Sequence, residues 1–228
     1  LAPFCISLSS MSTSNSLVLY ARFASSASWR VRCALNFKGL AYETVPVDIR
    51  NVDGQNRDKL NKLNPASRVP VLIHGERVLT ESLAIIEYLE ETFPMGPRLL
   101  PLDAYERAKS RAIALHIACG IQPVQNVRVT RKIDEIVSKG AHKEWAAYWM
   151  HLGLQELEGM LRKTAGTYSV GDTVSIADTC IPSIVYKGRG WNVDVCEFPT
   201  LHRIDENLAA ISAMAAAHQD NQADAPRK

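Results

Sequence analysis

The sequence lacks long apolar runs, and no stretch approaches the ~20 consecutive apolar residues that a membrane-spanning helix needs. It also lacks blocks of one charge: no Lys/Arg run exceeds two residues, and the formal net charge is only +2. Because such a chain is poorly suited to neutralising a phosphate backbone, we expect no nucleic acid and no membrane among its partners.

The few cysteines lack the spacing of a disulfide framework, and the histidines lack the spacing of zinc ligands. The five cysteines are Cys5, Cys33, Cys119, Cys180 and Cys196. Their number is odd, their spacing is wide and no Cys-x-x-Cys occurs, which argues against a disulfide framework or a redox pair and favours a reducing, cytoplasmic compartment. The six histidines form no zinc-binding spacing, so we expect no metal.

What the chain does contain is enough apolar material for a sizeable core. Of its 228 residues, 46% are hydrophobic, which suits one large or two small domains. Residues 1–15 differ from the rest: they are rich in serine, carry no charged side chain and lack the basic region of a signal peptide. We therefore expect residues 1–15 to be a disordered N-terminal extension.

Residues 16–98 show the alternation of a small α/β domain. Strand-like patterns are followed by helical ones in the order βαβ and then ββα. The expected strands are residues 17–20, 42–47, 69–73 and 77–79, and the expected helices are residues 28–38 and 82–90. The polar, turn-rich residues 50–64 are expected to form a loop.

Beyond a segment rich in Pro and Gly, residues 99–103 are expected to be a linker and residues 104–228 an all-helical domain. Ser175 and Asp178 match the S/T-x-x-D capping box, which predicts a helix beginning there. Further helices are expected at residues 104–119, around Met150–Leu161 and at residues 208–217. The polar tail after His218 is expected to be loose.

Three serines, Ser25, Ser26 and Ser28, lie where the first strand turns into a helix. A helix start exposes unpaired N–H groups and the positive end of the macrodipole, so it can receive an anion. The serine hydroxyls could steady a thiolate or carboxylate there, or one serine could simply be the N-cap.

Two further pieces lie at the ends of strands in the same domain. A cis Val69–Pro70 bond would leave the backbone of Val69 free to pair with a ligand's peptide backbone, although the residues alone favour trans. Ser82, after Glu81, could cap a helix or receive a ligand carboxylate. Together with the serine turn, these groups could hold a short peptide that bears a thiol and carboxylates.

Four segments carry a resemblance to a known family: residues 25–32, 64–72, 81–91 and 120–126. In these motifs the chain resembles the glutathione transferases, and most closely their zeta class, the maleylacetoacetate isomerases. The likeness runs from about Leu17 to Pro226. It implies a thioredoxin-like N-terminal domain, an all-helical C-terminal domain, a homodimer and glutathione as the cofactor.

The resemblance also implies the roles of individual residues. Ser25 would lie beside the glutathione sulfur, with Ser26 as the second catalytic candidate. A cis Val69–Pro70 bond would pair with the cysteinyl backbone. The residues expected to bind the cofactor are Ser25, Ser26, Ala27, Ser28, Trp29, Arg30, Gln55, Arg68, Val69, Pro70, Glu81, Ser82, Gln122 and Asn126.

The chain departs from the zeta-class pattern at three positions. Ala27 stands where the class usually has Cys, and Glu81 stands where it usually has Gln. A family arginine near the acceptor pocket aligns with Gly190, so the adjacent Arg189 is the substitute that we expect.

The reaction that the resemblance implies is the cis–trans isomerisation of maleylacetoacetate to fumarylacetoacetate, in tyrosine and phenylalanine catabolism. The substrate is a small dicarboxylate keto acid, so a basic pocket should receive it: Arg30 and Arg189 are the expected substrate-binding residues, and Arg128, Arg131 and Lys132 are further candidates. Two alternatives stay open: conjugation or dehalogenation of small α-halo acids, and a non-catalytic glutathione-binding module.

Overall fold

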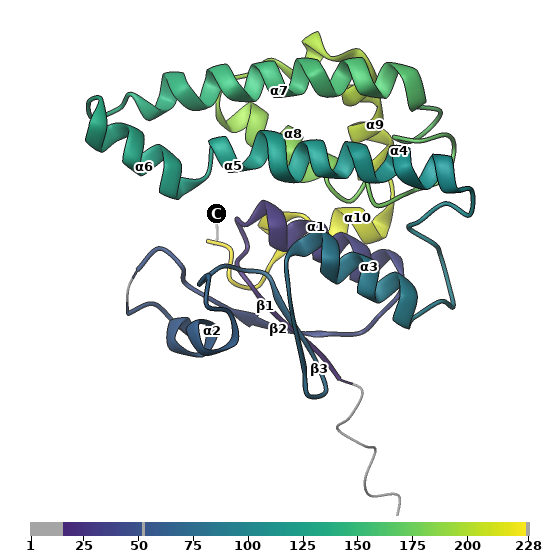
Figure 1. The fold of residues 1–228 in the computed structure, drawn as a ribbon, viewed down its shortest axis with the longest axis horizontal. Coiled ribbons are helices and arrows are strands. Elements are labelled where there is room, and N and C mark those ends of the chain that lie inside the picture. The colour runs from purple at the N-terminus through teal and green to yellow at the C-terminus, as the bar shows by residue number, and fades with distance from the viewer. Residues whose placement is uncertain (1–15, 52, 227–228) are drawn as a thin grey trace, which may run out of the picture.

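The protein is described here by a computed structural model that covers residues 16–51 and 53–226. The expected N-terminal extension, residues 1–15, lies outside the described residues. The first part of the chain has the expected α/β pattern (Figure 1). Its elements are β1 Leu17–Ala21, α1 Ser26–Phe37, β2 Glu43–Pro46, α2 Arg57–Leu63, β3 Val71–His74, β4 Arg77–Thr80 and α3 Ser82–Thr92.

Four connecting segments of the chain, those after β1, β2 and β4 and the one before β3, meet at one edge of the sheet. Its strand order is β2-β1-β3-β4, with β1 parallel to β2, antiparallel to β3, and β3 antiparallel to β4. The ends of β1, β2 and β4 and the start of β3 therefore meet at the same edge. Alternate residues of β1, namely Leu17, Leu19 and Ala21, are buried, which fixes this register against the core.

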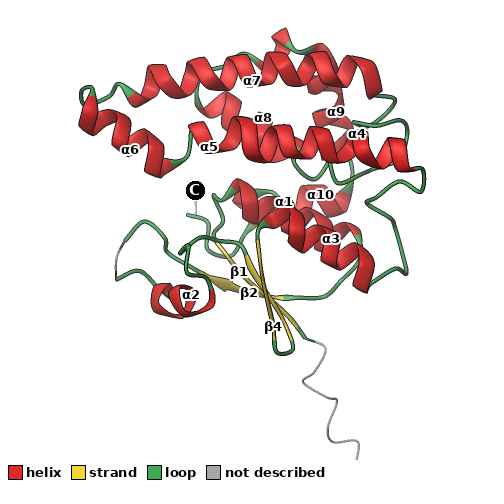
Figure 2. Cartoon of the chain, viewed as in Figure 1, coloured by secondary structure: helices red, strands yellow, loops and turns green. Residues whose placement is uncertain are grey.

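The second part of the chain is helical. Figure 2 shows α1 and α3 lying between the sheet and these helices, with α7 on the far side. Its longer helices are α4 Ala104–Leu115, α6 Val127–Ile136, α7 His142–Thr164, α8 Ile181–Gly190 and α9 Pro199–Ala209. One hydrophobic core extends from Leu17 through both parts to Ala217, so the division into two separate domains remains a prediction.

Two expectations in the α/β part were wrong in detail. The polar segment 50–64 contains the short helix α2, in which only Leu60 is buried, so its apolar periodicity was too weak to predict a helix. Helix α1 begins at Ser26 rather than Ser28, because Ser25 is its N-cap. Gly39, just after α1, has a positive φ of 68°, a conformation in which glycine is favoured at the end of a helix.

The expected helices of the second part also needed correction. The helix over residues 104–119 is α-helical only to Leu115 and continues as a π-helix, His116–Ile121. Only half of the capping box forms: Ser175 N donates to Asp178 Oδ2 at 2.7 Å, but Asp178 N donates to the carbonyl of Ser175 rather than to its hydroxyl. Helix α8 begins only at Ile181. The helix expected over 208–217 is divided between the end of α9 and α10, Ser212–Ala216.

The tail after His218 is packed rather than loose. Phe23 N donates to Asp224 Oδ2 at 2.9 Å, and Gln219 Nε2 donates to the Tyr186 hydroxyl at 3.0 Å. The first bond places the tail beside the turn between β1 and α1, and the second places it beside α8. Of the helices in the described ranges, none combines the length and apolarity needed to cross a membrane.

Candidate active site

The turn after β1 places Ser25 at the start of α1. Its Oγ accepts a hydrogen bond from Ser28 N at 3.2 Å, so Ser25 is the N-cap. This bond uses only an acceptor lone pair, and the hydroxyl hydrogen stays available to donate elsewhere. The capping and the functional interpretations of Ser25 are therefore compatible.

Ser25 faces a cavity of about 880 Å³ at the sheet edge where the four turns meet. Most of the residues expected to bind glutathione line this cavity, including both expected catalytic serines. They are Ser25, Ser26, Ala27, Arg30, Arg68, Val69, Pro70, Glu81, Ser82, Gln122 and Asn126. Gln122 and Asn126 belong to the helical part, so both parts of the chain contribute to the cavity wall.

Four expected site residues do not line the cavity. Ser28 and Trp29 lie on the buried side of α1, where the Trp29 ring packs against Tyr186 and His218. Gln55 is exposed in the segment between β2 and α2. Arg189 forms an ion pair with Asp205 at 3.1 Å and does not line the cavity, and its expected role in binding the substrate stays a prediction.

The Val69–Pro70 peptide bond is cis, as the resemblance implied and against the trans bond that the residues alone favoured. Strand β3 begins at Val71, and the N–H and C=O of Val69 take part in no hydrogen bond between described residues. Buried backbone N–H and C=O groups need hydrogen-bond partners, and the backbone of an extended ligand could provide a partner for each of these two groups. A peptide-like ligand therefore fits here.

The turn after β4 forms the next part of the wall. Glu81 has a φ of +65°, an uncommon conformation for a residue other than glycine, and Ser82 begins α3. The side chain of Glu81 is exposed while Ser82 is buried. The amides at the start of α3 can receive a carboxylate, and the Glu81 carboxylate can pair with an ammonium group. The α-ammonium and α-carboxylate of an amino acid would supply both of these groups.

Arg30 brings a charge to the same cavity from within α1. Its side chain is only 2% exposed, and Nε donates to Ser26 O at 3.4 Å. Burial lowers the pKa of Arg30, which the neighbouring thiol of Cys180 partly offsets. An arginine this deep remains cationic, so it favours an anion in the cavity. Its location agrees with the expected substrate contact, and that role stays a prediction.

Further cations line the cavity that the sequence did not single out. Of the earlier candidates, Arg128 and Arg131 line it, while Lys132 pairs with Glu135 at 2.8 Å and does not. The additional cationic residues are Arg22, Arg50, Arg57 and Lys187. Among the described residues, Glu81 is the only acidic side chain in the lining, so the cavity is strongly positive.

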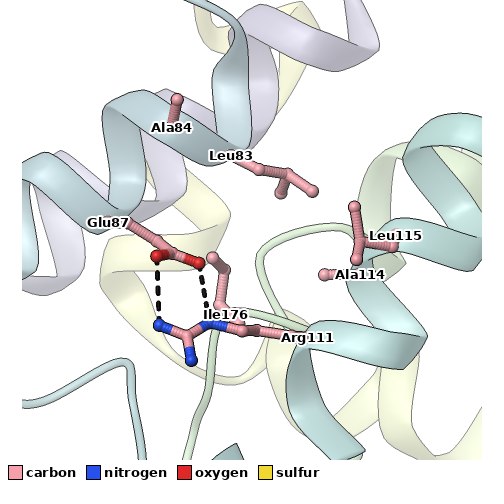
Figure 3. A pocket seen from close by; sticks show the side chains of 7 residues that line it. All are labelled: Leu83, Ala84, Glu87, Arg111, Ala114, Leu115 and Ile176. Carbon is pink, nitrogen blue, oxygen red and sulfur yellow. Dashed lines mark hydrogen bonds and ion pairs between the residues drawn. The ribbon is translucent and has the colours of Figure 1, made fainter. Parts of the chain in front are cut away.

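A smaller cavity of about 290 Å³ lies between α3 and α4 (Figure 3). Its walls are mostly apolar, and its one charged pair is closed: Arg111 Nε and a second guanidinium nitrogen donate to the two carboxylate oxygens of Glu87 at 2.8 and 3.0 Å. Because these charges satisfy each other, this cavity offers no free group for chemistry.

Comparisons with known proteins agree with this geometry. Residues 19–98 match the family model "Glutathione S-transferase, N-terminal domain". A "Probable maleylacetoacetate isomerase" of Caenorhabditis elegans is 45% identical over 207 residues, which cover 91% of this chain and 95% of that protein.

Two solved structures are similar over nearly the whole chain. A maleylacetoacetate isomerase of Anaeromyxobacter dehalogenans, with bound dicarboxyethyl glutathione and citrate, has a TM-score of 0.84 and 41% identity, and the match covers 94% of this chain and 99% of that one. A bacterial maleylpyruvate isomerase, described as a zeta-class glutathione S-transferase, has a TM-score of 0.86 and 34% identity, covering 92% and 100%.

Proposed function

The chain belongs to the zeta class of the glutathione S-transferase family, and from that premise we propose that it is a glutathione-dependent isomerase that converts maleylacetoacetate to fumarylacetoacetate. The observation that carries this proposal is the meeting of three features at one cavity: the Ser25 hydroxyl at the start of α1, the free backbone of Val69, and the start of α3 at Ser82. Each feature fits a different part of glutathione.

The residues present fit this cofactor. Val69 would pair with the cysteinyl backbone, and Glu81 with Ser82 would hold the ammonium and carboxylate of the γ-glutamyl end. Gln122 and Asn126 would complete the site from the helical part. Glu81 differs from the usual Gln, but a carboxylate can accept from the ammonium group at least as well as an amide oxygen.

When bound, glutathione supplies a thiolate that adds to the cis double bond and leaves once the resulting single bond has rotated. The protein's task is to stabilise that thiolate. A free thiol has a pKa of ~8.5, and lowering it by about two units requires ~2.7 kcal/mol of differential stabilisation. A donated hydroxyl bond contributes ~1.5–3 kcal/mol and a helix N-terminus ~0.3–1 kcal/mol. Ser25 and α1 can therefore supply most of this stabilisation.

The cationic lining supplies the second requirement, a place for an anionic substrate. Arg30 and the other cavity cations would attract a small dicarboxylate and hold it beside the sulfur. No acid or base on the protein is needed, since the sulfur that adds is also the group that leaves. Ser26, buried beside Ser25, is the nearest second hydroxyl that could share in holding the sulfur.

The proposal is tested by incubating the purified protein with glutathione and maleylacetone or maleylacetoacetate and following formation of the trans isomer. We expect turnover with glutathione and none with S-methylglutathione, which lacks the free thiol. Absence of isomerisation with glutathione would refute the proposal. Faster turnover of dichloroacetate than of either cis substrate would favour the dehalogenase alternative instead.

We further propose that the protein acts as a cytoplasmic homodimer in tyrosine catabolism. The support is the family membership, together with the reduced state expected of widely spaced cysteines. Sedimentation of the purified protein would give the oligomeric state directly, and a monomer at micromolar concentration would overturn that part.

A further inference from the structure

Three cations from separate elements gather on one side of the large cavity. Lys187 comes from α8, Arg22 from the turn after β1, and Arg50 from the segment after β2. We call these three residues the cationic triad. Lys187 and Arg22 are partly buried, and all three line the cavity.

No carboxylate in the described part of the chain forms an ion pair with the triad. Two acids are near enough to influence Arg22 but are engaged with backbone amides: Asp48 accepts from Arg50 N at 2.9 Å, and Asp224 accepts from Phe23 N at 2.9 Å. The ammonium of Lys187 lies 5.9 Å from the centroid of the Tyr186 ring, which is a weak contact. The charges of Asp48 and Asp224 therefore offset that of Arg22 only in part, and no described carboxylate pairs directly with any member of the triad.

The pKa of Lys187 reflects both its burial and the neighbouring positive charges. Burial lowers its pKa first, and the charges of Arg50 and Arg22 lower it further. Arg22 is subject to the same repulsion from Arg50, although Asp48 and Asp224 oppose it. Because like charges held together in a partly desolvated site destabilise one another, a bound anion would relieve all three at once.

The position of the triad separates it from the groups assigned to the γ-glutamyl and cysteinyl parts of glutathione. In the strand order β2-β1-β3-β4, Val69 and Glu81 flank β3 and β4, whereas Arg22 and Arg50 follow β1 and β2. Ser25 lies between the two groups, because it follows the central strand β1. A small molecule held by the triad would thus approach the sulfur from the side opposite to those two parts of the cofactor.

We propose that the cationic triad, centred on Lys187, binds a carboxylate of the acceptor substrate and so selects dicarboxylates over monocarboxylates. This inference rests on the proposed function, because the triad is useful only beside an activated thiolate. The glycyl carboxylate of glutathione is the other anion of the same chemistry within reach, and the experiment below distinguishes the two sources.

Maleylacetoacetate and maleylacetone differ in the carboxylate that the triad is proposed to bind. Maleylacetoacetate has two carboxylates, while maleylacetone lacks the terminal one. Replacing Lys187 by Met keeps the apolar stem and removes the charge. We expect Lys187→Met to lower kcat/KM for maleylacetoacetate by about 5- to 30-fold, the range of a partly exposed charge-assisted contact, and to change kcat/KM for maleylacetone by less than about 2-fold.

Two further variants make the comparison specific. Lys163→Met removes one charge from an exposed position of α7 outside the cavity lining and should leave both substrates unaffected. Gly190 lies three residues after Lys187 on the same face of α8, and a Cβ there meets no atom within 4 Å. Adding Gly190→Lys to Lys187→Met should therefore restore part of the lost preference for the dicarboxylate.

The glutathione dissociation constant, measured by calorimetry for each variant, distinguishes a carboxylate of the substrate from the glycyl carboxylate of glutathione as the anion that the triad binds. A glutathione affinity unchanged in Lys187→Met supports a substrate carboxylate, whereas a loss of glutathione affinity that matches the loss in kcat/KM assigns the triad to the glycyl carboxylate and overturns the inference. An equal loss in kcat/KM for both substrates would also overturn it.

Binding of succinate to the glutathione-loaded protein needs no turnover. Weaker binding in Lys187→Met than in wild type supports the triad even if the isomerase assay fails, and equal binding contradicts it.

Discussion

The large cavity has two walls that work by different means. The wall from the α/β part offers backbone groups and hydroxyls, namely the amides at the start of α1, the free peptide groups of Val69, and Ser82 at the start of α3. It also carries cationic side chains, which are Arg22, Arg30, Arg50, Arg57 and Arg68. The wall from the helical part offers side chains carried by helices, including Lys187 of α8 and Arg128 of α6. The first wall therefore combines groups of nearly fixed geometry with charges on flexible side chains, whereas Lys187 and Arg128 of the second wall are charges on flexible side chains alone.

This difference explains how specific each wall can be. Backbone groups at strand ends and helix starts are placed by the sheet itself, so they suit a cofactor that always has the same shape. Lysine and arginine side chains are long and flexible, so they can deliver a charge to substrates whose carboxylates lie at different positions.

The largest effect should come from removing Asp178, a buried carboxylate whose hydrogen bonds hold the segment just before α8. Asp178 is fully buried and accepts from Ser169 N, Ser175 N and Ser175 Oγ at 2.7–2.9 Å, while burial raises its pKa. Asp178→Ala strands these donors, which should cost about 2–5 kcal/mol of unfolding free energy and lower Tm by roughly 5–20 °C. Thermal unfolding followed by circular dichroism measures this loss.

Asp172 provides a matched control for Asp178. It also accepts two hydrogen bonds at 2.8 Å, both from Thr167, but its carboxylate is exposed. Water can replace those bonds, so Asp172→Ala should cost less than about 1 kcal/mol. If the two variants lost the same stability, burial would not be what makes the Asp178 bonds important.

These two walls also differ in how far the sequence predicts them. The serine turn, Val69–Pro70 and Glu81–Ser82 could be located because caps, prolines and strand ends are local signals, and all of these residues except Ser28 line the cavity. The sequence singled out Arg189, which does not line the cavity, and not Lys187, which does, because which face of α8 points inward depends on packing against other helices. The amphipathic pattern of α8 did not resolve positions so close together.

The next effect in size tests the cofactor wall. Ser25→Ala removes the hydroxyl that would donate to the thiolate and should lower turnover by ~10- to 150-fold, corresponding to ~1.5–3 kcal/mol. Part of the change would be structural, since the cap bond to Ser28 N is also lost. Steady-state kinetics at saturating glutathione, together with the pH dependence of turnover, measure the effect on the thiolate itself.

Ser25→Thr and Ser26→Ala are the controls for Ser25. Ser25→Thr keeps both the cap and a donating hydroxyl, so it should recover most of the activity that Ser25→Ala loses. Ser26→Ala should reduce turnover less, because Ser26 is not the residue expected beside the sulfur. If Ser26→Ala caused the large loss while Ser25→Ala resembled wild type, the catalytic role would belong to Ser26.

The smallest effect is expected at Ala27, where the family usually has Cys. Ala27 follows Ser26 at the start of α1 and lines the cavity, so Ala27→Cys places a thiol beside the cofactor site. The hydroxyl of Ser25 and the start of α1 already account for thiolate stabilisation, so kcat/KM for maleylacetone should change by no more than about 2-fold. Ala24→Cys, which adds a thiol to the same lining ahead of the helix, is the matched control. A tenfold gain in Ala27→Cys alone would mean that the cofactor wall needs a side-chain thiol, and that backbone and hydroxyl groups are not enough.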